Sequence, residues 1–128
     1  MEEFYNTFVH EANINEKDME IVKNVLMALS QCLKVDLQYL RASAIPDDIY
    51  HKIPLWHDCD IVEFLLDLSI TLKFDLDSIS MHNFPRLFSY KFFGITIFPG
   101  AKTLGNWVHS LIYCWMKVNG ISVLPHEF

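Results

Sequence analysis

Apolar residues recur at helical spacing in three stretches of the chain, and this pattern predicts three main helices. In residues 15–33 the apolar stripe begins after Asn15, a residue type favoured at the N-cap, and acidic side chains in the first turn suit the helix dipole. Residues 58–74 are apolar around most of the circumference, which is typical of a central helix. Residues 102–118 have Thr103 as a candidate cap, and Asn119-Gly120 as a stop signal.

The segments between these helices carry weaker patterns. Residues 34–55 contain two prolines and spaced apolar side chains, which predicts a long first loop packed over the core. Residues 74–88 have room for a short helix, and the β-forming residues near 90–98 predict a short strand or extended arm. The expected fold class is therefore mostly α, a small bundle of three main helices plus a short one.

Composition narrows the classes of function. A chain of 128 residues, 52% of them hydrophobic, is expected to form a single domain over 1–128, with 1–14 as a peripheral N-terminal segment. The net charge of −6 argues against a nucleic-acid or anionic-membrane surface and favours a protein partner with a basic surface. The pattern gives no indication of oligomeric state.

Location follows from what the chain lacks at sequence level. No apolar run approaches the ~20 residues of a membrane helix, and the N-terminus lacks the basic and apolar regions of a secretory signal. Cys32, Cys59 and Cys114 form neither a disulfide framework nor a zinc-binding spacing. We therefore expect a cytoplasmic protein without a membrane span.

Helix, long packed loop, helix, short segment and helix is the plan of acyl carrier proteins, and several stretches resemble that family. LKVDLQYLRASAIPDDI resembles the turn and loop after the family's first helix, DIVEF (60–64) is similar to the continuation of its second, and KTLGNWVHSLI to its closing helix. The resemblance covers about 19–117. It is closer still to a family of small, serine-less, carrier-like enterobacterial proteins with no established activity, whose layout FDLDSISMHNFPRLF followed by KTLGNWV resembles.

This resemblance implies a departure that concerns the cofactor. It places Asp58 where the carrier family has its modified serine, after an insertion around HKIPLW. Phosphopantetheine is joined through a serine oxygen, and a carboxylate cannot form that phosphodiester. The neighbouring Cys59 is one position off, and a thiol is not the family's acceptor. We therefore expect a carrier-like domain without a prosthetic group.

The cluster HDCD at 57–60 contains residue types that bind metals or act as nucleophiles, but its spacing suits neither role. Adjacent helical residues point in different directions, whereas a helical metal site uses i, i+3 or i+4 spacing, and only the single pair of His57 and Asp60 has that relation. A pair formed by Cys59 and His57 lacks an orienting group. Asp58 or Asp60 as an N-cap accounts for the cluster, so we expect neither a metal site nor a catalytic residue.

An acidic helix face is the expected functional feature. Asp60, Glu63 and Asp67 are spaced to lie on one face of the second main helix. That face is either an ordinary solvated surface or a docking surface for a basic partner, which is how carrier domains use the helix. His82 and His109 are expected to be surface or satisfied core residues. The aromatic residues of 84–98 are expected to be mostly core, with an exposed interaction patch as the alternative.

The leading interpretation is a non-catalytic, acyl-carrier-like domain that acts by protein–protein interaction through the acidic face. One alternative is an immunity or antitoxin-type protein that neutralises a basic toxin, since opposite charge would speed the association. Another is an atypical functional acyl carrier. An enzyme that uses Cys59 or the histidines is the least favoured hypothesis.

Overall fold

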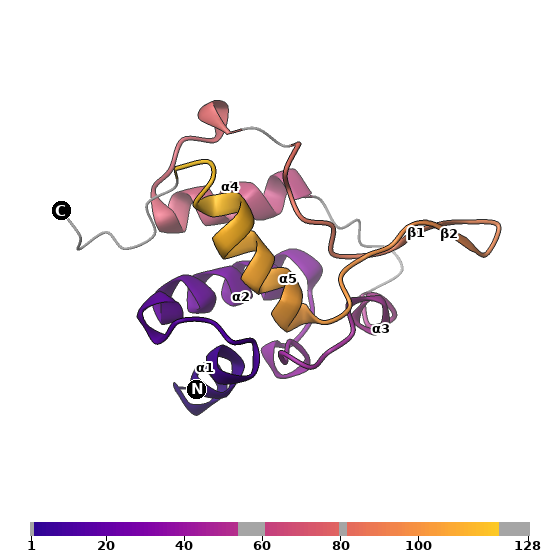
Figure 1. The fold of residues 1–128 in the computed structure, drawn as a ribbon, viewed down its shortest axis with the longest axis horizontal. Helices are drawn as coiled ribbons and strands as arrows, with labels where there is room; N and C mark the ends of the chain where they lie inside the picture. Colours follow the sequence, from indigo (N-terminus) through magenta and orange to yellow (C-terminus); the bar gives the residue numbers. More distant parts are fainter. Residues whose placement is uncertain (1, 54–60, 80–81, 121–128) are drawn as a thin grey trace.

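The structure is a computed structural model that describes residues 2–53, 61–79 and 82–120. These residues form five α-helices and a two-stranded antiparallel sheet, so the prediction of a mostly α protein is confirmed. α2 (Met19–Leu33) packs against α4 (Ile61–Leu72) and, on another side, against the N-terminal helix α1 (Figure 1). Side chains from all these helices and from the C-terminal helical stretch share one buried core.

The N-terminal segment is part of this core, which corrects the expectation that 1–14 is peripheral. Its residues form α1 (Glu2–Glu11), in which Tyr5, Phe8 and Val9 recur at helical spacing. Phe8 and Val9 are each only 1% exposed. The amphipathic pattern is short, but the contact with α2 buries it completely.

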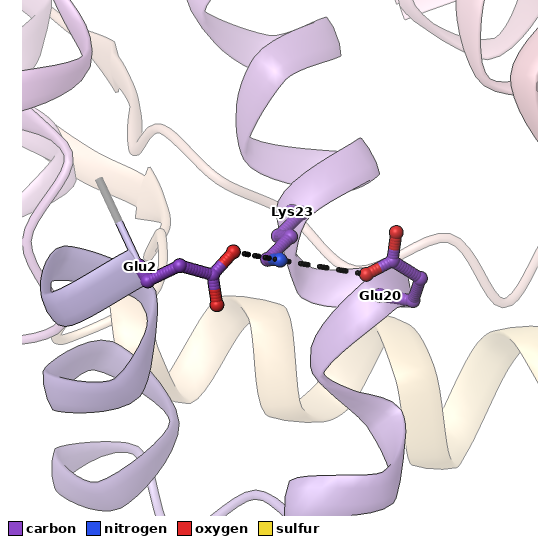
Figure 2. A network of polar contacts seen from close by, with 3 residues as sticks. All are labelled: Glu2, Glu20 and Lys23. Carbon is purple, nitrogen blue, oxygen red and sulfur yellow. Dashed lines mark hydrogen bonds and ion pairs between the residues drawn. The ribbon is translucent and has the colours of Figure 1, made fainter.

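A polar contact joins the outer surfaces of α1 and α2. The Lys23 ammonium lies between the carboxylates of Glu2 and Glu20, 3.6 Å from the latter (Figure 2). The same ammonium lies 5.7 Å from the centroid of the Tyr5 ring. The hydrogen bond to Glu2 holds the pKa of Lys23 above its ordinary value. Glu2 and Glu20 are exposed and Lys23 is half-buried, so this contact orients α1 on α2 and contributes little to stability.

The predicted start of the first main helix is confirmed in its capping, with a change in helix type. The Asn15 side chain accepts a hydrogen bond from the Lys17 backbone N–H at 3.2 Å, at the head of a 3-10 turn (Glu16–Asp18). This turn leads directly into α2. The helix ends at Lys34, whose φ of +58° is the left-handed conformation common at C-terminal caps.

The long first loop contains more regular structure than the sequence predicts. A 3-10 turn (Leu37–Tyr39) and the short helix α3 (Pro46–Tyr50) lie within it. Leu40 and Ile49 are buried, as expected of a loop packed over the core, whereas Ile45 is 49% exposed. Proline at the first position of α3 is favourable because its missing N–H would have no partner there.

The C-terminal helical stretch docks end-on against this loop. It consists of α5 (Leu104–Ser110) followed by a π-helical turn (Leu111–Met116). The Thr103 hydroxyl accepts a hydrogen bond from the Asn106 N–H at 3.1 Å, which confirms the predicted cap. The first backbone N–H groups of α5 donate to carbonyl groups of residues 42–44 at 2.8 and 2.9 Å.

Four aromatic rings connect α4, α5, the π-helical turn and the segment before the sheet. Phe84 lies 5.1 Å from Trp115 and 6.3 Å from Trp107, and Phe64 of α4 lies 5.8 Å from Trp107, measured between ring centroids. The Trp107 indole N–H donates to the Pro85 carbonyl at 3.0 Å. The short helix expected in 74–88 is a 3-10 turn (Leu76–Ser78).

The sheet is a hairpin of β1 (Tyr90–Phe92) and β2 (Ile95–Phe98), which confirms the strand or extended arm expected near 90–98. Residues 90–98 are called the arm below. Figure 1 shows the arm extending away from the helical body. Every residue of both strands is exposed, so the arm adds nothing to the core.

Candidate interaction surface

The predicted site residues do not all fall within the described part of the chain. The HDCD cluster, with Asp58 and Asp60, lies outside the described residues, so its role as a helix cap or as a substitute for the carrier serine stays a prediction. Of the predicted docking residues, Glu63 is exposed on α4 and Asp67 is half-buried there. The acidic face is therefore represented by a single exposed carboxylate in the described part of α4.

The same helix exposes a stripe of apolar side chains. Val62 is 61% exposed, Leu66 49% and Ile70 70%, and their spacing of four residues places them along one side of α4. Glu63 lies beside this stripe in the sequence. We call Val62, Glu63, Leu66 and Ile70 the α4 outer face.

This finding corrects the expectation of a central helix. Only one side of α4 is buried, through Phe64, Leu65, Leu68 and Leu72. Apolar residues around the whole circumference are typical of a helix that is buried on every side. They also occur on a helix that binds a partner through one of its sides. The signal that the sequence analysis missed is the four-residue spacing of Val62, Leu66 and Ile70. The more numerous core positions of the same helix concealed it.

The base of the arm is held by a polar clamp formed by Asp47, Ser89 and Gly100. The Asp47 carboxylate accepts two hydrogen bonds from Ser89, from its backbone N–H at 2.9 Å and from its hydroxyl at 2.7 Å. The Ser89 hydroxyl oxygen in turn accepts from the Gly100 N–H at 2.9 Å. These bonds from Ser89 hold the pKa of Asp47 below its ordinary value.

Glycine is required at the closing position of this clamp. A Cβ atom at Gly100 would lie 2.6 Å from the Leu87 carbonyl oxygen and from the Ser89 nitrogen. The two ends of the arm approach each other so closely that no side chain fits between them. The clamp therefore fixes the direction in which the arm leaves the body.

The arm itself has an aromatic face and a polar face. Tyr90 pairs with Phe98 and Phe92 pairs with Ile95, whereas Lys91 pairs with Thr96. Directly paired residues share a face and neighbours along β1 alternate, so the first two pairs lie on one side and the third on the other. A register irregularity between Tyr90 and Lys91 makes Ile97 an extra residue of β2, and the Tyr90 and Phe98 ring centroids lie 6.2 Å apart. We call the residues of the first two pairs the arm's aromatic face: Tyr90, Phe92, Ile95 and Phe98.

A buried carboxylate provides the other unusual polar contact, and its partners explain it structurally. Asp18 is 2% exposed and accepts a hydrogen bond from the Tyr113 hydroxyl at 2.6 Å. The same hydroxyl oxygen accepts from the Asn15 N–H at 3.0 Å. Burial, and secondly the bond to Asp18, raises the pKa of Tyr113. This contact joins the start of α2 to the π-helical turn.

Histidines and cysteines do not assemble into a reactive group in the described ranges. His82 is exposed, and the His109 ring lies 4.7 Å from that of Tyr113. Cys32 is buried in the core and Cys114 is exposed. Within residues 2–53, 61–79 and 82–120, no three His, Cys, Asp or Glu side chains lie together as a metal site would need.

One pocket of about 470 Å³ lies between α1 and residues 41–43, with Glu3, Glu11 and Arg41 at its wall. These three charged side chains are exposed, so the pocket gives a ligand no desolvated polar contact.

In the part of the chain that the structure describes, no helix is both long and apolar enough to span a bilayer.

No family model, curated protein or solved structure matches the chain. The resemblance to acyl carrier proteins therefore stays a prediction based on the stretches quoted above. The surface features of α4 and of the arm come from the structure alone and are independent of that resemblance.

Proposed function

We propose that the protein is a non-catalytic, acyl-carrier-like domain that lacks the phosphopantetheine serine and binds a protein partner through the α4 outer face. The observation that supports this most directly is the exposed stripe of Val62, Leu66 and Ile70. A helix that presents apolar anchors on one side fits a groove of matching shape on a partner.

The chemistry of the face defines the partner. Three aliphatic side chains call for an apolar groove, and the exposed Glu63 calls for a lysine or arginine at its rim. Burying an aliphatic side chain contributes about 2 kcal/mol. The apolar contacts would therefore provide most of the affinity, and the acidic residue would contribute to orientation and to the rate of association.

Quantitative affinity purification from the native host tests this proposal. The combined variant Leu66→Glu and Ile70→Glu is expected to weaken the partner's binding at least about a hundredfold, because two anchors of about 2 kcal/mol are lost. Met27→Glu is the matched control, since Met27 is also an exposed apolar residue, at 50%, but lies on α2. Equal recovery of partners by all three proteins would contradict the proposal.

The absence of a prosthetic group needs its own test. Co-expression with a broad-specificity phosphopantetheinyl transferase, followed by intact-mass measurement, is expected to leave the mass unchanged. A gain equal to the cofactor would show that the chain is a functional carrier, and would reject the serine-less part of the proposal without affecting the α4 outer face.

The net charge of −6 supports the alternative of an immunity or antitoxin-type protein. Binding to a basic toxin would be largely electrostatic and would fail when the salt concentration rises from about 0.1 M to about 1 M. Binding through the α4 outer face would persist, because apolar burial is not screened by salt. Salt elution of the purified complex therefore distinguishes the two functions.

A further inference from the structure

The arm carries two features that reduce the stability of an isolated chain. Phe93 at its tip is 88% exposed, and Phe92 and Ile95 are 56% and 65% exposed. Large apolar residues gathered at one exposed place are typical of an interaction site. A two-stranded hairpin without further packing is also marginally stable in water.

The tip adds backbone strain to this exposure. Phe93 and Gly94 have φ values of +52° and +76°, so together they form the two-residue turn of the hairpin. Asparagine, aspartate or glycine is favoured at the first of these positions, and a bulky aromatic residue there costs on the order of 1 kcal/mol. The Phe93 ring packs on Phe92, with 4.4 Å between ring centroids. The turn is therefore strained at Phe93, and the Phe93 ring is held by its packing on Phe92.

The clamp at the base holds the arm in one orientation relative to the body. Asp47, Ser89 and Gly100 fix both ends of the hairpin to α3 and to each other. The Arg86 guanidinium carbon lies 5.0 Å from the centroid of the Phe98 ring, which holds a second side chain of the aromatic face. An arm that is ordered before binding loses little conformational entropy on association.

We propose that the arm's aromatic face is the contact surface of a two-fold homodimer, in which the aromatic faces of two arms pack against each other. None of the four residues of the face is charged, Lys91 lies on the opposite side of the hairpin, and the Arg86 guanidinium stacks on the Phe98 ring at 5.0 Å. Two copies can therefore meet through the uncharged side chains of the two arms. Two-fold packing also requires only that the same patch be self-complementary.

The position of the arm allows it to pack against the arm of a second copy without bringing the two helical bodies together. Each chain carries a net charge of −6, so two helical bodies repel each other at short range. Because the arm extends away from the body (Figure 1), two arms can pack while the acidic bodies stay apart. A bilayer is the less suitable surface, since the outer edges of the hairpin carry unpaired backbone groups that hydrocarbon does not satisfy.

The available area predicts a weak dimer. A fully buried aromatic side chain removes about 150–250 Å² from water, so the four residues of the aromatic face together with Phe93 at the tip, all at least half exposed, offer on the order of 500 Å² per copy. Two copies reach about 1,000 Å², the lower limit for a specific interface. We therefore expect the dimer to have a dissociation constant in the micromolar range. Its association must be measured over a wide range of protein concentration.

Sedimentation velocity from about 1 µM to about 500 µM tests the dimer with variants on the two faces of one strand. Ile95→Glu places a charge on the aromatic face and is expected to weaken dimerisation at least about tenfold. Thr96→Glu is the matched control, because its carboxylate points to the other face, opposite Lys91, and supports the hairpin. A wild-type protein that stays monomeric throughout overturns the proposal, as does a Thr96→Glu variant that is affected as strongly as Ile95→Glu.

Phe93→Asn separates association from folding. Asparagine tolerates the left-handed turn, so the variant is expected to have a higher Tm than the wild type, measured below the dimer's dissociation constant, and to dimerise more weakly. A variant with unchanged dimerisation would show that the tip plays no part. Ile70→Glu should leave dimerisation unchanged, so failure of the dimer and failure of the α4 proposal give different results.

Discussion

The Asp47 carboxylate makes the stability of the clamp at the base of the arm dependent on pH. Its folded-state pKa lies below the ordinary value of 3.8 because Ser89 donates two hydrogen bonds to the carboxylate. A carboxyl with a lowered pKa stabilises the folded protein above the unfolded-state value. That contribution is lost as the pH falls below 3.8 through the folded-state pKa.

Asp47→Ala is therefore expected to destabilise the protein at about pH 6 and to make less difference at about pH 3. The measurement is the free energy of unfolding by urea for wild type and variant at both pH values. Asp48→Ala, at the exposed neighbouring position, controls for the general effect of removing a carboxylate from the first turn of α3. A difference between wild type and Asp47→Ala that does not change with pH would contradict the role of the clamp.

Tyr113 supports a buried carboxylate, and removing its hydroxyl leaves Asp18 without that donor. Tyr113→Phe is expected to lower the free energy of unfolding by about 1–3 kcal/mol, the usual penalty for an unsatisfied buried polar group. Urea denaturation measures it. Tyr39→Phe is the control because Tyr39 is 42% exposed, and a loss of similar size in that variant would show that the contact with Asp18 is not responsible.

At the scale of elements, packing at the start of α5 depends on one glycine. A Cβ atom at Gly105 would lie 3.0 Å from the Ala42 carbonyl oxygen and 3.1 Å from the Cβ atoms of Ala12 and Ala42. The Gly105 N–H also donates to that carbonyl at 2.9 Å, so the backbone must stay close. Alanine favours a helix by about 1 kcal/mol over glycine, which works in the opposite direction.

We expect the steric effect to exceed the propensity, so that Gly105→Ala destabilises the protein by about 1–3 kcal/mol. Thermal denaturation, with Asn106→Ala as the exposed neighbouring control, measures the effect. A Gly105→Ala variant as stable as the wild type would mean that the loop at 42–44 moves away freely, and that α5 is not docked on it as described.

Elements with strong periodicity were predictable and the others were not. Apolar spacing indicates α2, α4 and α5, and the caps at Asn15 and Thr103 follow from residue type alone. The π-helical turn after α5 leaves no such signal, because a change in hydrogen-bond register alters the spacing too little over six residues. The core role of α1 depends on its contact with α2, which no local pattern contains.

The candidate site was predictable only in part. Helical spacing identifies Glu63 as a surface residue, and it is exposed, but it also suggested an exposed Asp67, which is half-buried. The apolar half of the α4 outer face was missed because apolar residues around most of the circumference predicted a helix buried on every side. Whether an apolar residue faces the core or a partner is decided by which neighbours the fold supplies, and periodicity does not contain that information.

At the scale of the whole molecule, the two exposed apolar surfaces have separate roles in this account. The α4 outer face lies on a helix whose other side is firmly packed in the core, and it is assigned to a different protein. The arm extends away from the helical body (Figure 1) and is assigned to a second copy. A two-fold dimer would then present two α4 outer faces, which would increase avidity for a partner that is itself dimeric.

Amide hydrogen exchange of the protein, alone and bound to the partner recovered by purification, tests the central claim most directly. The account predicts that exchange across Ile61–Leu72 slows on binding, most strongly around Leu66 and Ile70, while α1 is unchanged. Protection confined to other elements, with α4 exchanging at its free rate, would contradict it.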